Sequence, residues 1–201
     1  MLIWLALLLW LFVLLRRIGF AVVKRLRLTA MLKRICAQNR WQYRQNRAAF
    51  ASFFGFAAQP DIEIETPETL YCIRLFTCVN QRWFLHFPKE NVALYTKRYI
   101  RLGKRASKSR AVYGDAASER VCVKKMRLLP PMKIPETEKT VERILLFNPA
   151  PKEISRVNAS RTAAEIVGSG DVVFGQRIYN AKWLEFALTP TAEKEQDYER
   201  V

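Results

Sequence analysis

The sequence predicts an α+β protein with an N-terminal transmembrane helix, a basic juxtamembrane helix and one domain rich in antiparallel strands. The first fifteen residues are uncharged and apolar, and ten Lys and Arg residues but no acidic residue precede Asp61. Beyond residue 60, short runs of β-branched and aromatic residues alternate with turn residues, which is typical of strands. Together these observations indicate a membrane anchor followed by a folded body.

The chain length allows one domain of ordinary size besides the anchor. We expect residues 1–25 to form the anchor with its basic flank, residues 26–189 to form a single α+β domain, and residues 190–201 to form an exposed tail. Within the domain, residues 26–40 are expected to be helical and residues 41–189 to form a strand-rich body. Half of all residues are apolar, which is enough to build a core.

The apolar run at the amino end is short for a membrane span. Fifteen helical residues rise about 22 Å, whereas the hydrocarbon core is about 30 Å thick. Arg16 and Arg17 can reach back to the headgroups, and residues 18–23 are again apolar, so we expect a tilted helix over residues 2–23. A secretory signal peptide fits less well, because no basic segment precedes the run and no small-residue cleavage site follows it. A buried helix is the remaining alternative.

The distribution of charge around this run predicts its orientation. Lys and Arg resist translocation, and all the local basic residues follow the apolar run, so we expect the amino terminus outside and the domain in the cytoplasm. In that compartment the four cysteines, Cys36, Cys72, Cys78 and Cys122, are expected to be small buried residues rather than disulfides. Because none forms a CxxC pair and His86 is the only histidine, we expect no zinc site.

The basic segment after the anchor has helical periodicity. Leu28, Leu32 and Ile35 recur on one side with Met31, and basic residues lie on the other. Two readings stay open: the helix lies along the anionic leaflet, or its apolar side packs on the domain while its basic side is solvated.

The body reads as a series of strands. Residues 41–60 are expected to be a strand and a short helix, and residues 61–69 a half-exposed strand. Three runs at short spacing predict an antiparallel meander: 69–79, 82–87 and 92–100. The later elements expected are strands at 120–129, 141–151, 153–157 and 171–180, and a helix at 181–188 that is capped by Asn180 and has Trp183, Leu184, Ala187 and Leu188 on its apolar side.

Fourteen basic residues are candidates to contact anionic lipid or phosphate. They are Arg16, Arg17, Lys24, Arg25, Arg27, Lys33, Arg34, Lys97, Arg98, Arg101, Lys104, Arg105, Lys108 and Arg110. The last seven lie in residues 97–110, which contain no acid. This stretch fits a solvated loop, a second contact with the leaflet, or a nucleic-acid contact.

The order of the acidic strand and the central strand is loosely similar to a restriction-nuclease-like core. That core places an Asp, often after Pro, before a strand carrying Asp/Glu-x-Lys, so that two carboxylates bind a metal. Here Asp61 follows Pro60, but Cys72 stands two residues before Arg74, where the carboxylate is required. A thiol cannot replace it in this chemistry. A solvated acidic strand with Glu63, Glu65 and Glu68 is the favoured reading.

These patterns favour a binding module over an enzyme, and they call for no cofactor, catalytic site or metal site. We expect a single-pass membrane protein whose cytosolic domain contacts anionic lipid or a protein partner. The alternative is a membrane-tethered nucleic-acid-binding or degenerate nuclease-like domain. An enzyme with catalytic residues dispersed along the chain also stays open.

Overall fold

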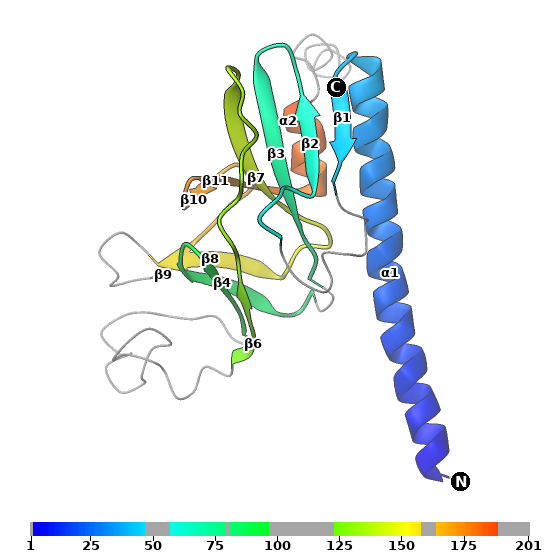
Figure 1. Ribbon diagram of the computed structural model, residues 1–201. Coiled ribbons are helices and arrows are strands. Elements are labelled where there is room, and N and C mark those ends of the chain that lie inside the picture. The colour runs from blue at the N-terminus through cyan, green and yellow to red at the C-terminus, as the bar shows by residue number, and fades with distance from the viewer. Residues whose placement is uncertain (1, 47–56, 79–80, 97–122, 158–163, 189–201) are drawn as a thin grey trace, which may run out of the picture.

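The computed structural model describes residues 2–46, 57–78, 81–96, 123–157 and 164–188. In these residues one long helix, α1 (Leu2–Gln38), precedes two sheets, and a short helix, α2 (Ala181–Leu188), follows them. Figure 1 shows α1 alongside the sheets, with its amino-terminal half projecting beyond them. The mixed α+β class with an N-terminal helix and a strand-rich body is therefore confirmed.

The strands form two sheets with different neighbours. The six-stranded sheet has the order β1 (Gln42–Gln45), β2 (Ile62–Glu65), β3 (Thr69–Phe76), β7 (Thr140–Phe147), β11 (Gln176–Asn180) and β10 (Val172–Val173). The five-stranded sheet has the order β6 (Val123–Leu128), β5 (Val92–Thr96), β4 (Phe84–Lys89), β8 (Glu153–Val157) and β9 (Ala164–Ile166). Six of the nine pairs in these residues are antiparallel, whereas β3–β7, β7–β11 and β4–β8 are parallel.

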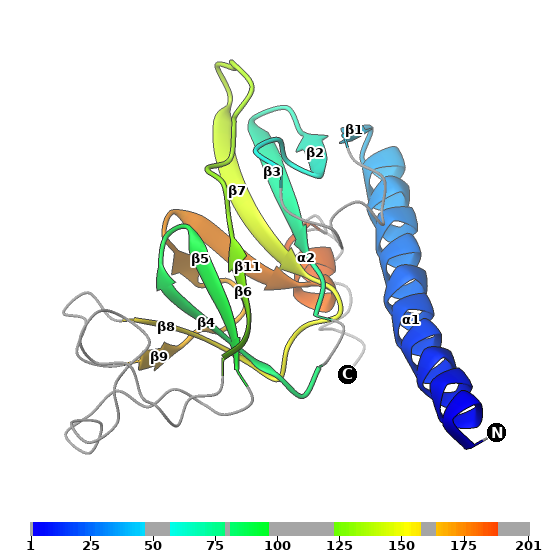
Figure 2. The same cartoon turned by 60° about the horizontal axis from the view of Figure 1, so that its bottom comes forward.

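The six-stranded sheet is the middle layer of the domain (Figure 2). Helices α1 and α2 cover one of its faces, where Leu28 and Leu32 of α1 and Leu184 of α2 pack on isoleucines and leucines of β2, β3 and β7. The five-stranded sheet covers the other face, where Leu85 and Tyr95 belong to the same core as strands β3 and β7. Both faces of the middle sheet are therefore buried.

This layering explains why the central strand is apolar on both sides. In β3, Ile73 and Leu75 face the helices, whereas Phe76 faces the second sheet, because successive side chains of a strand alternate. Phe76 also packs against Phe147 of β7, with ring centroids 4.8 Å apart. The prediction of a buried central strand at residues 69–79 is confirmed.

Helix α1 ends in a compact main-chain motif. Arg40 has a left-handed φ of 57°, the N–H of Trp41 donates to Cys36 O at 2.8 Å, and the N–H of Arg40 donates to Ala37 O at 3.3 Å. These two bonds satisfy the last carbonyls of the helix and turn the chain directly into β1. The helix expected at residues 26–40 thus ends at Gln38, two residues earlier, and it is continuous with the apolar segment before it.

Helix α2 begins as expected at its cap. The N–H of Trp183 donates to Asn180 Oδ1 at 3.0 Å, and Leu184 and Leu188 are buried. The prediction of a wider apolar side is wrong, because Trp183 is 52% exposed and Ala187 is also exposed. Because α2 has only two turns, only Leu184 and Leu188 are buried against the sheet. Trp183 packs edge-on against Phe186 on the solvent side of the helix.

The predicted meander of residues 69–79, 82–87 and 92–100 is confirmed for the antiparallel pair β4–β5 but wrong for β3. Strand β3 lies in the six-stranded sheet between β2 and β7, whereas β4 and β5 lie in the other sheet, where β5 pairs with both β4 and β6. The connection after β3 crosses between the layers. Spacing alone cannot separate such a crossing from a hairpin, since both need only a few residues.

Three of the four cysteines, Cys36, Cys72 and Cys78, are buried thiols, as expected. Cys122, the basic stretch 97–110 and the expected tail at residues 190–201 lie outside the described residues. Among the residues that are described, neither helix has the length and apolar character needed to cross a membrane.

The packing of α1 gives a first prediction. Leu32 is fully buried between α1 and the first sheet, so Leu32→Ala should lower the free energy of unfolding by about 2–5 kcal/mol. Leu26, on the same helix, is 54% exposed, and Leu26→Ala should change it by less than about 1 kcal/mol. Urea unfolding of the full chain in detergent micelles, followed by tryptophan fluorescence, measures both. Equal losses would contradict this account of the packing.

Candidate functional site

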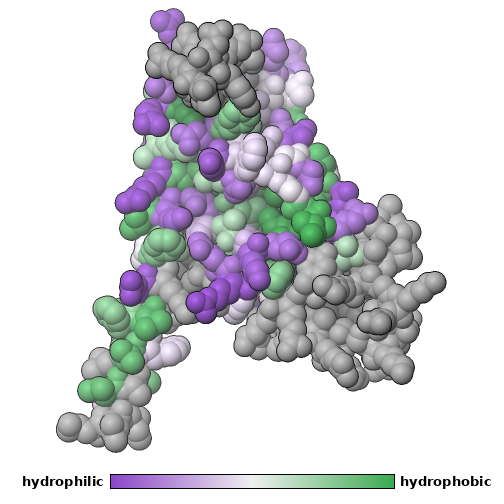
Figure 3. Space-filling model, turned by 180° about the vertical axis from the view of Figure 1, so that it is seen from behind, coloured by the Kyte–Doolittle hydropathy of each residue, from purple (hydrophilic) through white to green (hydrophobic). Residues whose placement is uncertain are grey.

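The amino-terminal half of α1 is an apolar surface without a partner in the described part of the chain. Large apolar side chains between 42% and 72% exposed surround it on all sides: Trp4, Leu5, Leu7, Leu9, Trp10, Leu11, Phe12, Val13 and Leu15. Figure 3 shows these hydrophobic side chains on the end of the helix that projects from the domain. Isolated soluble domains rarely expose a continuous apolar surface of this kind.

Contact between α1 and the domain begins at Ala21, which is 1% exposed. Two polar contacts follow. The Nη2 of Arg25 donates to Leu75 O at the end of β3 at 3.3 Å, and the Nδ2 of Asn148 donates to Lys24 O at 2.9 Å. Arg25 is fully buried, so the expectation that it contacts lipid is wrong. The sequence shows that Arg25 is charged, but it does not show that the side chain donates to the carbonyl oxygen of Leu75.

The other basic residues of α1 lie at the surface where the structure describes them. Arg16, Lys24, Arg27, Lys33 and Arg34 are exposed. The Nζ of Lys24 lies 5.0 Å from the centre of the Phe20 ring, so it points back along the projecting half of the helix. Because Leu28, Leu32 and Ile35 are buried, the apolar side of residues 26–40 packs on the domain and its basic side is solvated.

Two other basic residues on this helix contact neighbouring elements. The Nζ of Lys33 lies 5.6 Å from the ring of Tyr43, and Arg34 lies 3.9 Å from Glu185 of α2. Both contacts are solvent-exposed and weakly stabilising. The side chain of Arg17 and all seven basic candidates from Lys97 to Arg110 lie outside the described residues.

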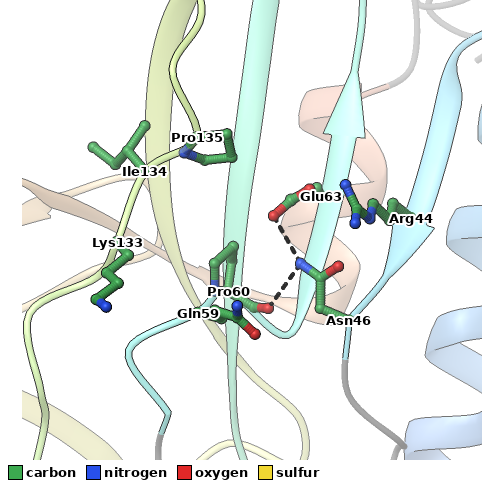
Figure 4. A pocket seen from close by; sticks show the side chains of 8 residues that line it. All are labelled: Arg44, Asn46, Gln59, Pro60, Glu63, Lys133, Ile134 and Pro135. Atoms are coloured by element: carbon green, nitrogen blue, oxygen red, sulfur yellow. Dashed lines mark hydrogen bonds between the residues drawn. The ribbon is translucent and has the colours of Figure 1, made fainter.

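A polar groove of about 410 Å³ lies beside the start of β2 (Figure 4). Three separate segments line it: Arg44 and Asn46 at the end of β1, Gln59, Pro60 and Glu63 around the start of β2, and Lys133, Ile134 and Pro135 after β6. Figure 4 shows Arg44 and Lys133 on opposite sides of it. The volume is in the range of small-molecule sites.

The groove is held by hydrogen bonds across its floor. The Nδ2 of Asn46 donates to Glu63 Oε1 at 2.7 Å and to Pro60 O at 3.2 Å, and the N–H of Lys133 donates to Ala58 O at 2.8 Å. The described side chains that line it offer cations, amides and one carboxylate. The groove can therefore hold a polar ligand.

The residues at nuclease-like positions are used for structure. The Oδ2 of Asp61 accepts a hydrogen bond from the N–H of Leu75 at 2.8 Å, and Glu65 pairs with Lys139 at 2.7 Å. Cys72 is fully buried, and burial raises the pKa of its thiol to about 11. The described residues contain no group of three His, Cys, Asp or Glu side chains that could hold a metal ion.

Arg74, where the nuclease motif has its lysine, is also buried. Its Nη2 donates to Ala57 O at 3.0 Å and to Pro130 O at 2.8 Å. These two bonds attach the segments at Ala57 and Pro130 to β3, and both segments continue into the lining of the groove. Arg74 therefore supports the groove from behind rather than entering it.

His86 lies apart from these acidic residues, in the five-stranded sheet. It is 1% exposed, and its Nδ1 lies 2.8 Å from Ser155 Oγ in a hydrogen bond between β4 and β8. Burial lowers the pKa of His86 to about 4, so the ring is neutral at pH 7. Asp61, Glu63, Glu65 and His86 consequently do not share one pocket.

Comparisons of the chain with known protein families, with curated proteins and with solved structures gave no match. Sequence reasoning found the projecting apolar helix but missed the groove, whose lining comes from segments near residues 45, 60 and 134. It also missed Asn148, because nothing in the strand that precedes it indicates a contact with α1.

The buried histidine gives a prediction on pH. The unfolded chain binds a proton near pH 6.5 and the folded chain only near pH 4, so stability falls as the pH is lowered through that window. From pH 7 to pH 5 the loss from His86 alone should be about 2 kcal/mol. Urea unfolding at both pH values measures it, with His86→Gln as the reference. An equal pH dependence in the variant would contradict the assignment.

Proposed function

We propose that this is a single-pass membrane protein that holds a binding domain at the cytoplasmic surface of a bilayer. The observation that supports the proposal most is that residues 4–15 of α1 expose large apolar side chains on all sides, whereas Ala21 is already buried. Burying one such side chain in an apolar medium contributes about 1.5–3 kcal/mol. A bilayer offers that medium to all of them at once.

The length of the projecting part sets how it inserts. Residues 2–20 rise about 28 Å, which is close to the hydrocarbon thickness of about 30 Å. Residues from Ala21 onward pack on a domain with a polar surface, so the embedded part ends before them. Arg16 and Arg17 then lie within about one to two turns of the interface, where long side chains reach the headgroups.

The charges on α1 support an outward amino terminus. Every basic residue of the helix follows the apolar run, and no acidic residue offsets them. The exposed cations Lys24 and Arg27 then lie nearest the anionic cytoplasmic leaflet. The domain, with its polar groove, acts there as a binding or scaffolding module for lipid headgroups or a protein partner.

A second candidate function is nucleic-acid binding by the same tethered domain. It is favoured by residues 97–110, where seven basic residues occur without an acidic one. Such a site would give affinity that falls steeply with salt concentration.

Membrane insertion is testable by extraction. The wild-type chain should stay in the membrane pellet after alkaline carbonate treatment, because its apolar helix is held by the hydrocarbon core. Leu7→Arg combined with Leu11→Arg should release most of it, since each charge at the centre of a span costs about 2.5–3.5 kcal/mol. Leu26→Arg, on the same helix but beside Lys24 and Arg27, is the matched control and should be retained. A folded wild-type chain in the supernatant would refute the anchor.

Orientation is testable with a reporter. A domain that is active only in the cytoplasm, fused after Val201, should be active in cells, because the basic residues after the apolar run resist translocation. Adding a tag with four lysines to the amino terminus should reduce this reporter activity, because the added charges favour a cytoplasmic amino terminus. An inactive fusion of an intact, membrane-bound chain would show the opposite orientation.

A further inference from the structure

Two chain segments meet where α1 leaves the domain. Strands β3 and β7 are parallel and end at the same edge of the first sheet, at the level from which α1 projects (Figures 1 and 2). The chain after each strand passes to the second sheet. The two passages are bonded together, because the N–H of Cys78 donates to Pro149 O at 3.0 Å and the N–H of Lys152 donates to Trp83 O at 2.9 Å.

These segments are also fixed to the helix. Asn148, directly after β7, donates to Lys24 O, and Arg25 donates to Leu75 O near the end of β3. Lys24 is one turn beyond Ala21, the first residue of α1 that the domain buries. The segments therefore flank the helix at the point where the proposed bilayer begins.

The exposed charged side chains of α1 and of the two segments at this point are cationic. Lys24, Arg82 and Lys152 are exposed and cationic. Trp83, next to Arg82 in the chain, is half-buried against the core of the second sheet, with its ring 5.9 Å from that of Tyr95. The Nζ of Lys152 lies 5.1 Å from the ring of Phe84. Residues 77–83 and 148–152 contain no acidic residue, and Glu153, the next in the chain, is half-buried.

We propose that Lys24, Arg82, Trp83 and Lys152 form an exit surface that docks on the headgroups of the anionic leaflet around the inserted helix. This inference rests on the proposed function, since only an embedded α1 brings the leaflet to this level. Cations beside an amphipathic tryptophan suit the charged interface of a bilayer. Because the surface is bonded to α1 at Lys24 and Arg25, docking would hold the domain in one orientation on the membrane.

The test uses the full chain in lipid nanodiscs and hydrogen–deuterium exchange. Peptides covering residues 81–84 and 149–154 should exchange about fivefold more slowly in discs with 30% phosphatidylserine than in phosphatidylcholine discs, as one cation at an anionic surface contributes about that factor. The difference should disappear in 0.5 M NaCl. Peptides from β3 and β7 report that the core is folded.

Charge reversal identifies the surface. Arg82→Glu combined with Lys152→Glu should abolish the lipid-dependent slowing. Lys33→Glu, on the far half of α1, combined with Arg40→Glu, just after the helix ends, should keep it. If exchange of the β3 and β7 peptides shows that the double variant is unfolded, Lys152→Gln alone replaces it, and a smaller loss of the lipid-dependent slowing is expected.

The outcomes separate the two proposals. A chain that does not stay in the discs refutes membrane anchoring itself. A chain that stays, but exchanges equally in both lipids or keeps its slowing after charge reversal at Arg82 and Lys152, refutes the exit surface alone. The latter result would also be expected if a protein partner, rather than lipid, covered these residues.

Discussion

The structure depends on the burial of one side of α1 against the six-stranded sheet. Leu28, Leu32 and Ile35 close the core under that sheet, and the two hydrogen bonds at Lys24 and Arg25 fix how far along the helix the sheet reaches. One unbroken helix therefore has two surroundings. Protein buries a single stripe of its second half, whereas residues 4–15 expose large apolar side chains on all sides of the helix.

Local features of the fold could be predicted from the sequence because they depend on neighbouring residues. The apolar periodicity of residues 26–40, the two-sided apolar strand at 69–79 and the cap at Asn180 are examples. The division into two sheets could not be predicted, because a short connection after β3 fits a hairpin as well as a crossing. The parallel pairs β3–β7 and β4–β8 join strands more than sixty residues apart, and no local pattern specifies them.

Buried arginines mark a further limit of sequence reasoning. Arg25 and Arg74 look like surface charges in the sequence, yet both are at most 1% exposed and donate to main-chain carbonyls. Burial of a guanidinium is costly unless such acceptors surround it. Arg74 joins the two segments that lead into the polar groove by donating to Ala57 O and Pro130 O. Nothing in the sequence indicates these two hydrogen bonds, so the groove could not be predicted from it.

The continuity of α1 has a mechanical consequence. Between the projecting half and the packed half the helix has no break, so the domain and the projecting half tilt together as a lever. If the projecting half spans a bilayer as proposed, a bilayer thinner than its rise of about 28 Å would tilt it away from the membrane normal. The same angle would then be imposed on both sheets and on the opening of the groove. Local bilayer thickness would thus decide which way the groove faces.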